Sequence, residues 1–190
     1  MPQIYRLLPA DYHRYKTHLL CLDEESKYMR FGFHATYDSI MQVYNKWIQA
    51  PDEHVIFAIE NEDLEVIAVA HISLQDKPVE LAFSVAKEYQ GQGLGSALMA
   101  KAVEYCQNRS IKAGCMVCLN TNERIKRLAK KHGLLIKEGT EVLANVAIPK
   151  PSPASLIHEA VGNNMAAIDH LGKAQRKLAK MFSFPLQFMK

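Results

Sequence analysis

The stretch "EYQGQGLGS" (88–96) holds three glycines at alternate positions. An apolar, strand-like run (80–86) precedes it, and a run with helical periodicity (97–107) follows. Ordering a glycine costs more conformational entropy than ordering any other residue, so three in one short turn need a reason. A strand, a glycine-rich turn and a helix start bring unpaired N–H groups and the positive end of the helix dipole to one point. The stretch therefore predicts an anion-binding site.

Three kinds of phosphate-binding turn contain glycines in such a pattern. A P-loop needs G-x-x-x-x-G-K-[ST], which does not occur in this sequence. A dinucleotide fingerprint counted from Gly91 needs a glycine where the chain has Ser96, and the next strand ends in Asn120 rather than an acidic residue. A pyrophosphate arch, Q/R-x-x-G-x-G/A, matches residues 90–95 at every position. A plain strand-to-helix turn needs only one glycine, so we interpret the stretch as a pyrophosphate arch.

The apolar pattern continues along the first 149 residues. Strands are expected at 3–8, 54–60, 64–74, 78–86, 114–120, 134–138 and 141–148. Helices are expected at 11–22, 36–48, 97–107 and 122–133, with a loop at 23–33. Residues 61–63 are typical of a hairpin turn. This order predicts a mixed α/β domain over residues 1–149.

A second segment follows "PKPSP" (149–153). Ser152 and Pro153 are typical of a helix start, and apolar residues then recur at near-helical spacing through 150–190. Gly162 and Gly172 predict that this helix is broken or closely packed. Basic residues near its end alternate with apolar ones, namely Phe182, Phe184, Leu186 and Phe188. Such a helix can lie on an anionic membrane, but we expect it to dock on its own domain or on a second copy, as a homodimer.

Charge and composition exclude several classes of protein. The net charge is +3, and the five basic against two acidic residues of 151–190 are too weak a signal for nucleic-acid binding. No run of about 18 apolar residues occurs, and charges interrupt the N-terminus where a signal peptide is apolar. The C-x-x-C pair Cys115 and Cys118 lies on an expected strand, where i and i+3 face opposite ways. We therefore expect buried structural thiols, no metal site and a cytoplasmic location.

The arch resembles motif A of the GCN5-related N-acetyltransferase (GNAT) family. That family commonly has an asparagine opening the next helix, an apolar residue six positions later and a glycine eleven later; Asn122, Leu128 and Gly133 match. The resemblance covers residues 3–149. It implies a mixed, mostly antiparallel sheet of about seven strands flanked by helices, with acetyl-CoA as co-substrate.

The resemblance also implies a set of cofactor contacts. The pantetheine arm would pair as an extra strand with the backbone near Val85, whose N–H would polarise the thioester carbonyl. Asn122 would hydrogen-bond the same arm, although asparagine suits a helix N-cap equally well. The implied cofactor-binding residues are Phe83, Ser84, Val85, Gln90, Gly91, Gln92, Gly93, Leu94, Gly95, Ser96 and Asn122. The basic residues of the helix after Asn122 are expected to form a solvated face, or in part to bind the cofactor's 3′-phosphate.

Acetyl transfer to an amine requires a neutral nitrogen. Deprotonating an amine with a pKa of about 10.4 costs about 4.6 kcal/mol at pH 7, so a carboxylate base is expected. Glu80 is the candidate; the alternative is that it is a solvent-facing strand residue. Many family members have a tyrosine acid seven residues after the asparagine, where this chain has Ala129. A thiol pKa of about 8.5 lets the thiolate leave without one. His71 is expected to be packed rather than catalytic.

A narrower resemblance concerns "SKYMRFGF" (26–33). It is similar to a loop in the acetyltransferase domain of bacterial protein-lysine acetyltransferases, in which an acidic residue on the fourth strand is the base. The matching residues are Ser26, Tyr28, Arg30, Phe31 and Glu80. We expect an N-acetyltransferase acting on a primary amine, either a protein lysine or a small polyamine-like or amino-acid acceptor. The alternatives are a non-catalytic acyl-CoA sensor and, more distantly, a dehydrogenase.

Overall fold

The computed structural model describes residues 2–75, 77–131, 135–137 and 141–183. Its seven-stranded sheet has the order β1-β2-β3-β4-β5-β7-β6. The strands are β1 (Tyr5–Leu7), β2 (His54–Glu60), β3 (Val66–Ser73), β4 (Val79–Val85), β5 (Ala113–Leu119), β6 (Leu135–Lys137) and β7 (Glu141–Ala147). The helices are α1 (Tyr12–Cys21), α2 (Glu24–Phe31), α3 (Tyr37–Gln49), α4 (Leu94–Asn108), α5 (Glu123–Lys131) and α6 (Pro153–Ser183). Among these strands only β4 and β5 pair in parallel, which confirms the expected mixed, mostly antiparallel sheet.

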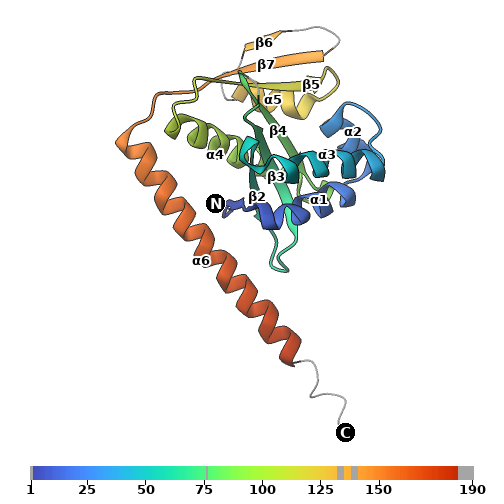
Figure 1. Ribbon diagram of the computed structural model, residues 1–190, viewed down its shortest axis with the longest axis vertical. Helices are drawn as coiled ribbons and strands as arrows, with labels where there is room; N and C mark the ends of the chain where they lie inside the picture. The colour runs from blue at the N-terminus through green and yellow to red at the C-terminus, as the bar shows by residue number, and fades with distance from the viewer. Residues whose placement is uncertain (1, 76, 132–134, 138–140, 184–190) are drawn as a thin grey trace.

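The residues of β2 show how helices cover both faces of the sheet. All of them are buried, and successive side chains point to opposite faces. Val55, Phe57 and Ile59 belong to the core that includes α4 and α5. Ile56 and Ala58 belong to a second core, which α1 and α3 cover. The sheet is therefore a central layer between two layers of helices (Figure 1).

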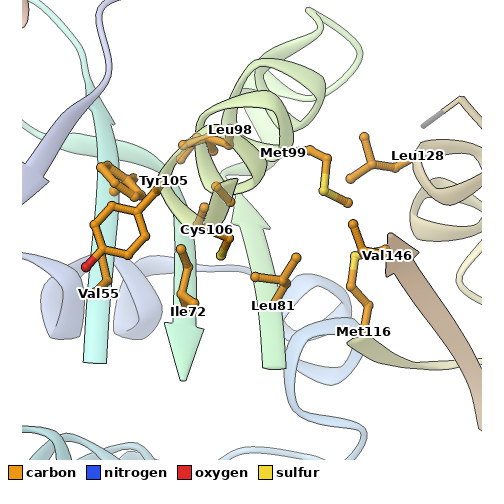
Figure 2. Packing of buried hydrophobic residues seen from close by; sticks show 14 of the residues in the cluster. Val55, Ile72, Leu81, Leu98, Met99, Tyr105, Cys106, Met116, Leu128 and Val146 are labelled. Carbon is orange, nitrogen blue, oxygen red and sulfur yellow. The ribbon is translucent and has the colours of Figure 1, made fainter. Parts of the chain in front are cut away.

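The first core lies between α4 and the middle of the sheet. Leu98, Met99 and Cys106 of α4 are fully buried; Cys106 points toward Ile72 and Leu81 of the sheet, and Met99 toward Leu128 and Val146 (Figure 2). Burying each large apolar side chain contributes about 1.5–3 kcal/mol, so this contact fixes the direction of α4. The helix that follows the glycine turn is consequently held rigidly with its N-terminus at the end of β4.

The strands β4 and β5 diverge after a short contact. They pair only at Val79 with Gly114 and at Glu80 with Cys115, whereas β3 stays paired with β4 as far as Val85. Residues 81–85 consequently have no ladder partner on the β5 side within the described part of the chain. A strand edge inside a sheet is a place where an extended ligand that carries amides can add as a further strand.

The prediction of a loop at 23–33 is wrong, because residues Glu24–Phe31 form the helix α2. Its caps account for it: the Asp23 carboxylate accepts a hydrogen bond from the Ser26 N–H (2.8 Å), and Gly32 ends the helix at φ 78°. None of its residues is fully buried, so the apolar periodicity that reveals most helices is weak here. The helix places Ser26 and Arg30, four residues apart, on one face.

The helix α6 is continuous, so of the two alternatives for Gly162 and Gly172, a break or close packing, the break does not occur. A Cβ added at Gly162 would lie 3.8 Å from the Lys101 Nζ of α4. It begins at Pro153 as expected, and the Ser152 hydroxyl accepts a hydrogen bond from the Ser155 N–H (3.1 Å). None of the helices in the described residues is long and apolar enough to cross a membrane. Gly133, which matches the family motif, and the apolar residues Phe184, Leu186 and Phe188 lie outside the described residues.

Buried histidines lie between the sheet and α1. The Nδ1 of His18 donates to the Val66 carbonyl and its Nε2 accepts from the Ser84 hydroxyl, each at 2.9 Å. Burial lowers the pKa of His18 to about 4. His71 is buried beside His54, with ring nitrogens 3.1 Å apart, and burial lowers the pKa of both. His71 is thus a packed residue, as expected.

These histidines predict a loss of stability in mild acid. A folded-state pKa below the unfolded value of about 6.5 stabilises the protein above pH 6.5, and this contribution is lost as the pH falls toward 4. For His18 alone the loss is at most about 3 kcal/mol. We expect the free energy of unfolding, measured with urea, to be lower at pH 5 than at pH 7. In His18→Gln this free energy should depend less steeply on pH. An equal slope in that variant would show that His18 is not responsible.

Candidate active site

A cavity of about 360 Å³ lies where β4, the glycine turn, α2 and α5 meet. It is lined by all the implied cofactor-binding residues except Gln92. Gln92 is exposed and donates its side-chain amide to the Glu88 carbonyl (3.2 Å), so its side chain does not line the cavity and its predicted contact with a ligand would involve the backbone. The other lining residues are Ser26, Met29, Arg30, Tyr89, Arg124, Ile125, Arg127 and Leu128. Most of these come from α2 and α5; the basic residues of α5 were expected in part at the cofactor's 3′-phosphate, whereas α2 was expected to be a loop and was not placed at the cofactor.

The turn has the geometry of an anion cradle. Gly91 and Gly93 adopt φ of 78° and 82°, a left-handed conformation that other residues rarely adopt. Gly93 is the N-cap of α4 and has no side chain to satisfy the first N–H groups of the helix. A Cβ added at Gly91, Gly93 or Gly95 would meet no atom within 4 Å. The lack of side chains at these three positions therefore leaves space that a ligand can occupy, because no other part of the protein fills it.

The side chain of Gln90 has a structural role in addition to its predicted contact with the cofactor. Its side-chain amide donates to the Val85 carbonyl (2.9 Å) and to the Ser26 hydroxyl (3.2 Å). These bonds tie the end of β4, the glycine turn and α2 together. The first position of the arch motif therefore has a structural reason that is visible only once α2 is in place.

Asn122 shows the N-cap geometry. Its Oδ1 accepts from the Ile125 N–H (3.1 Å), and its Nδ2 donates to the Met29 carbonyl of α2 (3.4 Å). Asn122 is buried and lines the cavity. The hydroxyl of Ser84, in contrast, donates to His18 (2.9 Å), so its proton is already used within the protein.

Glu80 lies in a separate, smaller hollow of about 30 Å³. This hollow shares four lining residues with the cavity, namely Met29, Arg30, Phe83 and Ile125. Glu80 occupies the last position at which β4 and β5 pair, and its side chain is exposed. The two hollows therefore adjoin at the point where the strands diverge.

Ala129, which replaces the tyrosine acid of many family members, and the basic residues of α5 differ in whether they line the cavity. Ala129 is fully buried in the core and does not line the cavity. Arg124 and Arg127 of α5 do line it, whereas Lys126 forms an ion pair with Glu123 (2.8 Å). Only part of the basic helix is therefore available to a bound phosphate.

The family of the chain follows from this fold and this turn together. The model of the acetyltransferase (GNAT) family matches residues 17–134, well over half of the sequence. The chain belongs to the GNAT family of acetyltransferases. It is accordingly an acetyltransferase that uses acetyl-CoA, which confirms the predicted enzyme class and co-substrate and leaves the dehydrogenase alternative without support.

Solved structures share the fold at low sequence identity. The GNAT domain of PAT from S. lividans is 19% identical with a TM-score of 0.63, over 76% of this chain and 89% of that domain. Spermidine N-acetyltransferase from Vibrio cholerae, solved with CoA and spermine, is 14% identical with a TM-score of 0.59, over 77% and 96%. A GNAT acetyltransferase from Streptococcus pneumoniae is 20% identical with a TM-score of 0.57, over 76% and 98%. No curated protein sequence matches the chain.

Proposed function

We propose that this enzyme transfers the acetyl group of acetyl-CoA to an aliphatic primary amine by direct attack on the thioester, with Glu80 as general base. The observation that carries the proposal is the junction of the two hollows at Phe83. The larger one meets the glycine turn, and the smaller one contains the only carboxylate among the residues that line either hollow. A donor and an acceptor bound in them would meet where β4 and β5 diverge.

The larger cavity fits acetyl-CoA by the chemistry of its walls. The open cradle at Gly91 to Gly95 suits a pyrophosphate, and the guanidinium groups of Arg124 and Arg127 are suited to a further phosphate. The unpaired edge of β4 at 83–85 suits the amides of the pantetheine arm. The bound co-substrate supplies the activated acyl group, and a backbone N–H near Val85 would stabilise the oxyanion of the attacked carbonyl.

The smaller hollow fits the amine half of the reaction. Met29 and the exposed Val117 line it beside Glu80, whereas the side chains of Leu81 and Met116 are buried in the core against α4. Such walls suit the methylene chain of a lysine or a polyamine. The carboxylate accepts a proton from the ammonium group, directly or through one water, and the neutral amine then attacks the thioester. No tyrosine stands at position 129 to protonate the thiolate, and a thiol pKa of about 8.5 makes that step tolerable without an acid.

We favour a protein lysine as the acceptor over a small polyamine. The resemblance of Ser26, Tyr28, Arg30 and Phe31 to the loop of bacterial protein-lysine acetyltransferases supports this choice, as does the fold shared with the PAT domain. The fold shared with a spermidine acetyltransferase keeps polyamines as the second candidate. We also assign catalysis to residues 1–149 and an accessory role to 150–190. None of the four cysteines, all within the described residues, forms a disulfide, which supports a reducing, cytoplasmic location.

The test is thiol release from acetyl-CoA with a panel of acceptors. The panel contains lysine peptides, intact proteins, spermidine and free amino acids. We expect release that depends on a lysine-containing acceptor and gives an acetylated ε-amine by mass spectrometry. Release with spermidine alone would replace the favoured acceptor. Tight binding of acetyl-CoA with no turnover on any amine would instead indicate a sensor of acyl-CoA.

A further inference from the structure

The helix α6 turns its charged side toward its own domain. Its most buried residues, Glu159, Ala166 and Lys173, recur every seven positions. The Glu159 carboxylate accepts hydrogen bonds from Arg109 (2.9 Å) and from Asn108 (2.7 Å) of the α4 end. Lys173 donates to the backbone carbonyl of Glu60 (3.2 Å). The contact between α6 and the domain is thus mainly polar.

The basic residues near the end of α6 continue this polar contact. Arg176 forms an ion pair with Glu62 (2.8 Å), and Lys177 donates to the Asp63 carbonyl (2.9 Å), both in the turn between β2 and β3. Lys180 lies 4.0 Å from the Asp63 carboxylate. The positive charges of α6 are therefore directed at an acidic turn of the same chain.

The opposite side of α6 is apolar and exposed along the whole helix. Ile157, Val161, Ile168, Leu171, Leu178 and Phe182 are each at least half exposed. Together with the exposed Asn164 and Gln175 they form one stripe, in which successive members are three or four positions apart in the sequence. We call these eight residues the α6 seam. The seam has the heptad spacing of a coiled coil, and it lies on the side opposite Glu159, Ala166 and Lys173.

We propose that two copies of this chain associate through the α6 seam as an antiparallel helix pair. The seam is self-complementary in one antiparallel register. Ile157 then meets Phe182 of the other copy, Val161 meets Leu178, Ile168 meets Leu171, and Asn164 meets Gln175. Every apolar residue has an apolar partner, and the two amides can hydrogen-bond each other. An isologous two-fold contact requires this kind of self-complementarity.

The size and the borders of the seam suit a stable dimer. Its exposed apolar side chains, with Met165 and Met181 beside them, present roughly 900 Å² per copy, close to one partner's share of a standard interface. Ala160, Ala167 and Ala174 flank the seam at intervals of seven residues, so the two helices can approach closely. Because the domain of each copy lies on the far side of its α6, the two domains would not collide (Figure 1).

The charges of α6 lie off the seam and are paired within the chain. Glu159 binds Arg109, Asp169 binds Lys173, and Arg176 binds Glu62. The antiparallel orientation therefore rests on the register of the seam, in which each apolar residue meets an apolar partner and Asn164 meets Gln175. A membrane-bound helix would need its basic residues beside the apolar face, but these side chains are directed at Glu62 and Asp63.

Sedimentation equilibrium of the full chain tests the dimer. We expect a dimer, and we expect Ile168→Glu to raise its dissociation constant at least about 100-fold because a charge enters the seam. The matched variant Asn163→Glu adds the same charge at an exposed position off the seam and should leave the dimer intact. A monomeric parent chain, equal effects of the two variants, or association that follows anionic vesicles rather than protein concentration would overturn the proposal.

Disulfide trapping tests the register in a Cys21→Ser background, which removes the exposed cysteine. In the proposed pair, residue 161 of one copy faces residue 178 of the other. A mixture of Val161→Cys and Leu178→Cys chains should therefore give linked heterodimers, whereas neither variant alone should cross-link. Positions 161 and 178 lie about 25 Å apart along the helix, so cross-linking of each variant with itself would indicate a parallel pair and overturn the register.

Discussion

Replacing Glu80 with glutamine is expected to lower kcat by about 100-fold or more while the affinity for acetyl-CoA is unchanged. A general base contributes about 10²–10⁴-fold to such reactions, and glutamine keeps the shape of the side chain without its basicity. Affinity is retained because Glu80 lines the smaller hollow and not the cavity at the glycine turn. Turnover with the best acceptor and calorimetric binding of acetyl-CoA measure the two quantities.

The pH profile makes this prediction specific. If Glu80 removes the proton of the amine, the variant should recover part of its rate at high pH, where more of the acceptor is already neutral. Glu88→Gln is the matched control, because Glu88 is exposed near the turn but lines neither hollow. Equal rates in Glu80→Gln and the parent enzyme would mean that Glu80 is only a surface residue of its strand.

Replacing Gly95 with leucine is expected to weaken acetyl-CoA binding by at least about 100-fold without lowering the melting temperature. Gly95 lies in the first turn of α4, its φ is not in the left-handed region, and a Cβ there meets nothing within 4 Å. Leucine is a better helix former than glycine, so the fold should tolerate it or gain stability. The new side chain would fill the space in which a pyrophosphate contacts the helix N-terminus.

Two comparisons separate this effect from strain. Gly93→Ala alters a residue at φ 82°, so it should lower both the melting temperature and the affinity. Gly162→Ala alters a glycine of α6 that does not line the cavity, and its added Cβ would meet only the end of the Lys101 side chain (3.8 Å), so acetyl-CoA binding should be unchanged. If Gly95→Leu, measured beside these variants, binds acetyl-CoA with unchanged affinity, the pyrophosphate does not bind at this end of α4.

The glycine turn was predictable because its chemistry is local. A strand, a turn with a left-handed backbone and a helix N-terminus are contiguous in the sequence, and 90–95 could be matched without long-range information. The strands and helices of 1–149 were predictable for a similar reason, since periodicity reports burial. The exception was α2, whose identity depends on the caps Asp23 and Gly32 rather than on an apolar stripe.

Other parts of the site required the folded chain. Gln90 has a structural role because α2 brings Ser26, sixty-four residues away in sequence, within hydrogen-bond distance of its side chain. Gln92 fits the spacing of the motif equally well, yet its side chain bonds back to the Glu88 carbonyl and lies outside the cavity. The spacing of a motif does not give the direction in which each side chain points. That direction follows from the backbone of the turn and from its neighbours.

The sequence by itself therefore determined the individual strands, the phosphate-binding turn and the family of this protein, because each rests on contiguous residues whose periodicity or backbone demands are local. Tertiary structure alone decided that β4 and β5 diverge just beyond Glu80, so that two hollows adjoin there. It also decided which side of α6 is free. The sequence shows an amphipathic helix, and the usual expectation is that the apolar side packs on the domain. The acidic turn at Glu62 and Asp63 instead binds the basic side, and the apolar seam faces outward.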